Sequence, residues 1–113
     1  MNFTEAQEWY EKAAAQGYAK AQTNLGLMHY RGANGPQDVI QARYWWEQAA
    51  AQGHGGAMAG IGLSYMHGFD VEQDLNEAMR WLLKAKAHGK DVSTEIAAVI
   101  EERKRQNSGL PNK

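Results

Sequence analysis

The sequence predicts an all-α protein, an α-solenoid built from antiparallel helix pairs. Three observations predict this fold class: a shift of 36 residues superposes Trp9 on Trp45 and Trp45 on Trp81, helix-start signals recur at the same spacing, and a glycine closes each unit. A fixed period of this length is typical of repeat arrays in which each unit is too small to bury its apolar face alone. Because the connecting loops are short, neighbouring helices should be antiparallel.

Three capping boxes predict where one class of helix, the B helices, begins. Each box pairs an Asn or Asp, which can accept a hydrogen bond from a free backbone N–H, with a Glu or Gln three residues later. The boxes are Asn2 with Glu5, Asp38 with Gln41, and Asp74 with Glu77. We therefore expect B helices over about 3–16, 39–52 and 75–88, each ended by a glycine.

The stretches between the B helices predict the A helices, from about Ala19 to Arg31 and from about Gly56 to His67. Gly26 and Gly62 lie inside them, where glycine costs roughly 0.5 to 1 kcal/mol relative to alanine. Close approach of Trp45 or Trp81 from the paired B helix would offset that cost. We accordingly expect six helices in three antiparallel pairs, with Trp9, Trp45 and Trp81 in equivalent, largely buried positions.

The last period departs from the repeat. Asp91 can cap a helix with an apolar stripe of Val92, Ile96, Val99 and Ile100, whose other faces are charged. A polar outer face is typical of the terminal unit of a solenoid. The expected organisation is one domain over 1–106, followed by a tail over 107–113. Its parts are a half repeat over 1–17, repeats over 18–53 and 54–89, and a C-terminal capping helix over 90–106.

Composition excludes several classes of function. The chain has no cysteine, so disulfides, thiolate metal sites and cysteine nucleophiles are excluded. A net charge of −1 and a pI near 6.4 argue against nucleic-acid and membrane partners, which attract basic proteins. No apolar run is long enough for a bilayer span or a signal peptide. We expect a soluble chain that is cytoplasmic, or periplasmic or secreted if a signal peptide was removed.

The N-terminal edge carries a separate expectation. The chain begins at the cap of a B helix, so the A helix that would normally precede it is missing, and Phe3, Trp9 and Tyr10 should be partly uncovered. An uncovered apolar edge favours either continuation of the array or self-association through the N-terminal helix.

The repeat has a recognisable consensus: A-x-x-x-L-G, then G-x-x-x-x-x-D-x-x-x-A-x-x-W-x-x-x-A-A-x-x-G. This pattern resembles the Sel1-like repeat, a relative of the tetratricopeptide repeat, over Ala6 to Gly89. The departures are His29 for the usual tyrosine, Asn34 and Asp70 for the loop glycine, and Lys86 for the second alanine. The resemblance implies a right-handed α-solenoid that acts as a bacterial adaptor between other proteins.

Catalytic signals are weak. His29, His54, His67 and His88 show no tight metal-ligand spacing, and we interpret His29 as a hydrogen-bonded core residue. We therefore expect no metal, no cofactor and no enzymatic activity. The alternative is a small hydrolase or ligand-binding enzyme of the β-lactam-binding type, because some Sel1-like proteins have been linked to β-lactams. No S-x-x-K motif supports that alternative here.

A second apolar stripe on the A helices predicts where a protein or peptide partner binds. One stripe of the first A helix, which includes Ala21 and Leu25, is needed for packing, whereas a second stripe lies opposite. The predicted partner-binding residues are Lys20, Thr23, Leu27, Tyr30, Arg31, Ala59, Leu63, Met66 and His67. By register the stripe continues through Gly56 and reaches Val99 and Arg103.

In similar repeat proteins this second stripe lines the concave face. We expect Tyr30 and Met66 to anchor a peptide there, and the basic residues to favour an acidic or carboxylate-ended segment. The alternative for Leu27 and Leu63 is that they pack between adjacent A helices.

Overall fold

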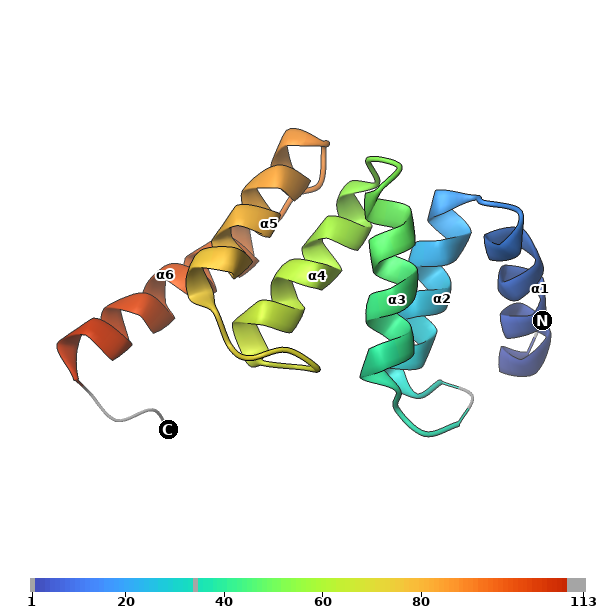
Figure 1. The fold of residues 1–113 in the computed structure, drawn as a ribbon, viewed down its shortest axis with the longest axis horizontal. Helices are drawn as coiled ribbons and strands as arrows, with labels where there is room; N and C mark the ends of the chain where they lie inside the picture. Colours follow the sequence, from blue (N-terminus) through green and yellow to red (C-terminus); the bar gives the residue numbers. More distant parts are fainter. Residues whose placement is uncertain (1, 34, 110–113) are drawn as a thin grey trace.

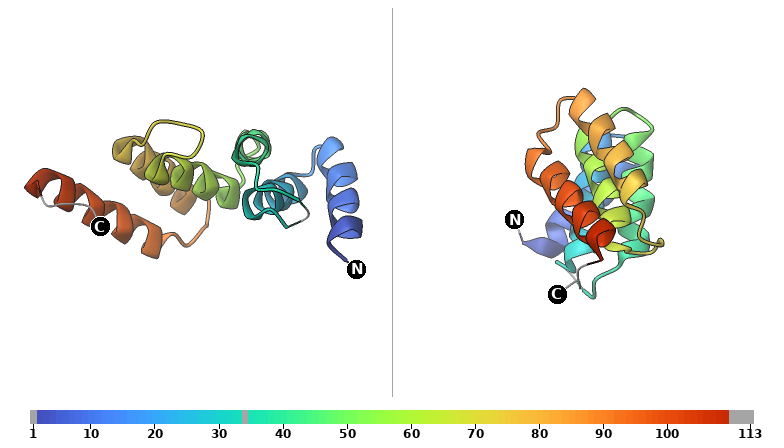
Figure 2. Two further views of the ribbon diagram at one scale, coloured as in Figure 1. Left: turned by 90° about the horizontal axis from the view of Figure 1, so that it is seen from below. Right: turned by 90° about the vertical axis from the view of Figure 1, so that its left-hand side faces the viewer.

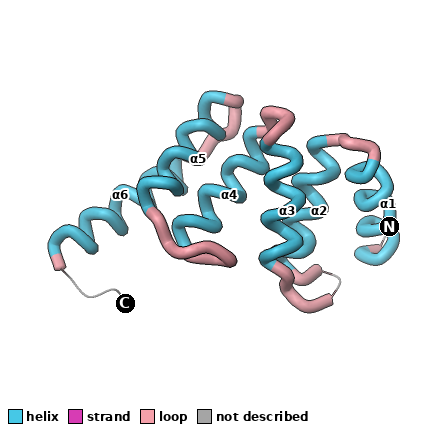
Figure 3. Tube along the Cα trace, in the orientation of Figure 1, coloured by secondary structure: helices cyan, strands magenta, loops and turns pink. Residues whose placement is uncertain are grey.

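The computed structural model describes residues 2–33 and 35–109. Within these ranges the chain forms six α-helices and no strand (Figure 3). The helices are α1 (Phe3–Ala15), α2 (Ala19–Arg31), α3 (Val39–Ala50), α4 (Gly55–His67), α5 (Leu75–Ala87) and α6 (Ser93–Ser108). They follow one another along the long axis of a molecule of 48 × 30 × 21 Å (Figures 1 and 2). The predicted all-α solenoid is confirmed.

The helix pairing is less uniform than the sequence predicts. The most extensive contacts join α2 to α3 and α4 to α5, and these are the two complete A–B pairs. α1 is a B helix that packs on α2, and α6 holds the A position after α5, with the fewest contacts of the five consecutive pairs. The described chain therefore has two complete pairs flanked by single helices rather than three pairs.

All three predicted B-helix caps form. The side chains of Asn2, Asp38 and Asp74 accept hydrogen bonds from the backbone N–H three residues later, at 2.8, 3.0 and 3.0 Å. Each bond satisfies a donor that the first turn of a helix leaves without an intrahelical partner. Local sequence therefore sets the starts of α1, α3 and α5.

The turns after the A helices repeat in detail. α2 and α4 end at Gly32 and Gly68, both in the left-handed region at φ of 67° and 75°. Beyond each glycine, the amide of Gln37 or Gln73 donates to the carbonyl of Tyr30 or Met66, at 2.8 Å in both cases. These glutamines, one period apart, satisfy a carbonyl that the end of the helix leaves free.

The tryptophan prediction is wrong. Trp9 is 59% exposed, whereas Trp45 and Trp81 are half-buried. The buried position of the repeat is the following residue, which is Trp46 in α3 and Leu82 in α5. Trp45 packs against the apolar cluster of the first unit, and Trp81 packs against that of the unit before it. This position covers the preceding repeat, and no described residue forms such a repeat before Trp9.

Large side chains do pack closely against the glycines of the A helices, as predicted, but they are Trp46 and Leu82 rather than Trp45 and Trp81. A Cβ at Gly26 would lie 2.6 Å from Nε1 of Trp46, and one at Gly60 would lie 2.6 Å from Cδ2 of the same ring. The indole therefore lies between α2 and α4, and its Nε1 donates to the carbonyl of Thr23 at 3.2 Å. In the next repeat Leu82 takes this place, 3.0 Å from a Cβ at Gly62.

The C-terminal helix differs from the prediction at both ends. Asp91 lies one residue before the cap position, where its carboxylate accepts from the N–H and hydroxyl of Ser93 at 3.1 and 2.6 Å. These bonds lower the pKa of the Asp91 carboxyl below its ordinary value. α6 runs to Ser108, so 107 and 108 are helical rather than part of a tail, and 110–113 lie outside the described residues.

The apolar stripe of α6 is only partly covered. Val92 and Val99 are buried and Ile96 is half-buried, but Ile100 is exposed. Among the described residues, no helix combines the length and apolar character that crossing a membrane requires.

Candidate partner-binding surfaces

The predicted partner stripe of the A helices is divided between packing and surface. Leu27 and Tyr30 pack against the cluster that contains Trp46, and Met66 packs against the cluster that contains Leu82. Ala59 is buried in that second cluster, so it cannot contact a partner directly. An A helix touches both its own B helix and the following repeat, and for that reason it needs two packed stripes.

Thr23 belongs to the same junction between repeats. Its hydroxyl donates to the carbonyl of Ala19 at 3.0 Å and lies 2.8 Å from Nδ1 of His54 at the start of α4. Since the single hydroxyl hydrogen goes to Ala19, the ring donates from Nδ1. Burial, followed by the charges of Lys20 and Lys90, lowers the pKa of His54 below its ordinary value. Thr23 is therefore engaged in joining α2 to α4.

The exposed part of the stripe is a row of basic side chains. Arg31, His67 and Arg103 occupy the same position in α2, α4 and α6, one period apart, and all three are exposed. Lys20 is also exposed but lies at the other end of α2, away from this row. Leu63 is half-buried. Of the predicted stripe, Arg31, His67 and Arg103 are thus surface residues.

An aromatic chain runs beside the basic row. The ring of Tyr30 lies 5.7 Å from that of Trp46 and 5.7 Å from that of Phe69, and Phe69 lies 5.3 Å from His67. Sequence reasoning missed Phe69, because it lies in the turn after α4 and has Ala33 as its counterpart one period earlier. Tyr30, Phe69 and His67 therefore connect the ends of the two A helices.

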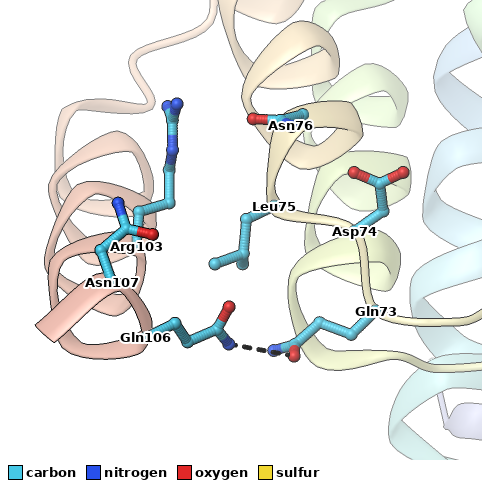
Figure 4. A pocket seen from close by; sticks show the side chains of 7 residues that line it. All are labelled: Gln73, Asp74, Leu75, Asn76, Arg103, Gln106 and Asn107. Atoms are coloured by element: carbon cyan, nitrogen blue, oxygen red, sulfur yellow. Dashed lines mark hydrogen bonds between the residues drawn. The ribbon is translucent and has the colours of Figure 1, made fainter. Parts of the chain in front are cut away.

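A polar cavity of about 400 Å³ lies at the end of the basic row (Figure 4). It is lined by Gln73, Asp74, Leu75, Asn76, Arg103, Gln106 and Asn107, from the start of α5 and the last turns of α6. Gln106 donates to Gln73 across it at 3.3 Å. Amides that donate and accept, together with a guanidinium, can bind the carboxylate and backbone groups of a peptide.

A second cavity, of about 330 Å³, lies between α1 and the start of α2. We call it the N-terminal groove; its lining residues are Trp9, Tyr10, Ala13, Tyr18, Lys20, Ala21 and Asn24. Tyr18 is 62% exposed, and the rings of Trp9 and Tyr10 meet edge to face at 5.6 Å. The predicted uncovering of this edge is confirmed for Trp9 and Tyr10, whereas the side chain of Phe3 lies outside the described residues.

Among the residues that the structure describes, no three His, Asp or Glu side chains come together in a way that could hold a metal ion. His29 is half-buried at the wall of a small cavity near Gly32.

The repeat identified by its geometry matches a known family. The Sel1 repeat matches residues 2–18, 19–54 and 56–90. The chain belongs to the Sel1 repeat family. Sel1 repeats are typically protein–protein interaction modules and are generally non-catalytic scaffolds.

Solved Sel1 structures resemble the chain closely. A Sel1 repeat protein from Oxalobacter formigenes is 34% identical with a TM-score of 0.77, over 96% of this chain and 42% of that one. A protective antigen of uropathogenic Escherichia coli strains, which displays the same type of repeat fold, is 34% identical with a TM-score of 0.74, over 79% of this chain and 19% of that one. The chain thus spans less than half the length of either protein. No curated protein matched it.

Proposed function

We propose that this Sel1 repeat protein is a non-catalytic adaptor that binds an acidic peptide segment along the last turns of α2 and α4 and the exposed side of α6 at Arg103. The observation that carries the proposal is the row of Arg31, His67 and Arg103, which repeats once per period on an otherwise nearly neutral chain. Exposed bases at a constant spacing suit a partner with carboxylates at a matching spacing.

The surroundings of the row supply the other contacts that a peptide needs. The ring of Phe69 lies beside His67 and meets that of Tyr30, which precedes Arg31 in the chain. The amide-lined cavity at Arg103 suits the terminal carboxylate of a peptide or the backbone of its last residues. The peptide would lie across the A helices, in agreement with the concave face expected from the sequence.

A charge-reversal experiment tests the proposal. The probe is a fluorescein-labelled octapeptide of alternating Glu and Leu with a free C-terminal carboxylate, titrated into the intact chain and followed by anisotropy. Replacing Arg31 and Arg103 together with Glu should weaken peptide binding by about tenfold or more, which corresponds to about 1.4 kcal/mol or more. The reason is that two attractive contacts with the carboxylates of the peptide become repulsive. Higher salt should weaken binding to the parent chain.

The matched control reverses two exposed bases that lie outside the row, Lys12→Glu on α1 and Arg80→Glu on α5, so that its net charge changes by as much as that of the Arg31 and Arg103 variant. Equal loss of affinity in the control and in the Arg31 and Arg103 variant would show that the peptide responds only to net charge. In that case the row is not the binding surface.

A further inference from the structure

The N-terminal groove is the first of three equivalent grooves, each formed by a B helix and the A helix that follows it. The second lies between α3 and α4, where α2 fills it: Ala19, Leu27 and Tyr30 pack against the cluster of that groove. Thr23 also enters, since its Cγ2 lies 3.6 Å from a Cβ built at Gly56.

The third groove, between α5 and α6, is filled by α4 in the same way. A Cβ at Gly55 would lie 3.1 Å from the carbonyl oxygen of Ala85 and 3.1 Å from Cβ of Lys90. Met58 and Ala59 pack in one cluster with Leu82 and Val92. The chain therefore contains two copies of this interface in their occupied form.

The lining of the N-terminal groove corresponds to these occupied copies position by position. Trp9, Tyr10, Ala13 and Ala21 are one period before Trp45, Trp46, Ala49 and Ala57. In Figure 1 α1 lies at the end of the row of helices, with α2 on only one side of it. No described helix fills this first groove, and Trp9 and Tyr18 remain largely exposed in it.

The filling helices show what an occupant must look like. In α2 the filling stripe is Ala19, Thr23, Leu27 and Tyr30. In α4 the same register gives Gly55, Ala59, Leu63 and Met66, of which Gly55, Ala59 and Met66 pack against the third groove. Both have the same spacing of four, four and three residues, which places the four side chains on one face of a helix. Both also have the same order of sizes: a small residue, a second small residue or Thr, a Leu, and a large apolar residue.

We propose that the N-terminal groove binds one amphipathic helix of a partner protein that carries this stripe. The partner has Gly or Ala first, Ala, Ser or Thr four residues later, Leu eight residues later, and Tyr or Met eleven residues later. In the second groove Thr23 meets His54, and Tyr18 holds the place of His54 here, so a hydroxyl at the second position of the stripe suits the groove. Lys20 on the rim favours a carboxylate beside the stripe.

A second copy of this chain does not carry a free helix of the required kind. The stripes of α2 and α4 are already used between the repeats. At the last repeat position the same register holds Asp91, just before α6, and Glu95, Val99 and Glu102 within it. This stripe is mostly acidic, and Val99 is buried against α5. The occupant is therefore not a second copy of this chain, and this surface is separate from the basic row.

The test uses the intact chain and a synthetic peptide with the sequence of residues 18–31, blocked at both ends, which carries the stripe of α2 and contains no tryptophan. Binding is followed by tryptophan fluorescence and by ¹⁵N spectra of the protein. We expect a blue shift of the tryptophan emission and spectral changes confined to α1 and the first turns of α2. A peptide with Asp at the position of Leu27 should not bind.

Two variants localise the effect. Trp9→Ala should weaken peptide binding about tenfold, because a large aromatic side chain that lines an interface contributes strongly to binding. Its affinity is measured from the ¹⁵N spectra, since the variant lacks the tryptophan of the groove. Tyr44→Ala is the matched control: Tyr44 is 49% exposed and meets Trp45 edge to face, as Trp9 meets Tyr10, but it lies outside the groove. The control should bind like the parent chain.

Three results would overturn the inference. One is equal affinity of Trp9→Ala and Tyr44→Ala for the peptide. Another is loss of binding on reversing Arg31 and Arg103, because those residues belong to the basic row and not to the groove. The third is a concentration-dependent dimer in sedimentation that Trp9→Ala abolishes, which would make a second copy the occupant.

Discussion

Replacing Gly60 with alanine separates local helix preference from tertiary packing, because the two effects have opposite signs there. In an exposed helix, Gly→Ala stabilises by about 1 kcal/mol. At Gly60 the new Cβ would lie 2.6 Å from Cδ2 and 2.8 Å from Cε2 of the Trp46 indole. The ring cannot simply retreat toward α2, since it already lies so close to the backbone of Gly26 that a Cβ there would be 2.6 Å from Nε1.

The expected result is therefore destabilisation. Overpacking of this kind costs about 1 to 3 kcal/mol, so after the gain in helix preference the free energy of unfolding should fall by up to about 2 kcal/mol. For a domain with a total stability of about 5 to 15 kcal/mol, this is a large fraction. Gly62→Ala should cost less, because its new Cβ would meet the branched end of Leu82 at 3.0 Å.

Urea denaturation of a double-mutant cycle measures the effect. Trp46→Leu places at this position the residue that the next repeat has at Leu82, which removes the ring from Gly60. In that background Gly60→Ala should be neutral or stabilising, with a coupling energy of about 1 to 3 kcal/mol. A Gly60→Ala protein more stable than the parent chain would refute the placement of the indole between α2 and α4.

Two further predictions concern the A helices. Replacing Tyr30 and Met66 together with alanine should lower the free energy of unfolding by about 2 to 4 kcal/mol, because both side chains pack between repeats while keeping some exposure. An unchanged melting temperature would show that both residues belong to the open surface, as the sequence predicted. His54 should make stability depend on pH, because its lowered pKa favours the neutral ring in the folded chain. The contribution of His54 to the free energy of unfolding is fully present above its ordinary pKa of 6.5. This contribution is lost as the pH falls through 6.5 and then through the lower pKa of the folded chain. Urea denaturation between pH 5 and pH 8 should show this slope and its reduction in His54→Gln, and equal slopes in the two proteins would exclude His54 as the cause.

The sequence by itself determined the helices and their period. The caps at Asn2, Asp38 and Asp74 act over three residues, so their partners can be found without any knowledge of the fold. Gly32 and Gly68 end helices for an equally local reason, because the left-handed conformation is accessible to glycine at no steric cost. The repeat register follows from residue identities alone, and the match to the Sel1 repeat confirms the family.

Tertiary structure decided which faces are buried. Trp45 and Trp46 are adjacent and both apolar, but neighbours on a helix point about 100° apart, and only the packing of α2 and α4 shows that Trp46 is the enclosed one. The second stripe of the A helices looked unneeded, because a single helix pair requires only one apolar face. Stacking of repeats gave that stripe a neighbour and buried Ala59.

The residues of the candidate sites also differ in whether the sequence alone could predict them. Arg31 and His67 could be predicted as surface residues from the sequence, because they end their helices and carry polar groups. The ring of Phe69 beside them could not, since a residue in a turn has no periodicity that fixes its direction. The N-terminal groove was foreseen as an uncovered edge, but its likeness to the two filled grooves became visible only when α2 and α4 were seen to lie in them. A sequence pattern shows which residues share a chemical character and a helix face, whereas the contacts between two helix faces depend on how the helices stack.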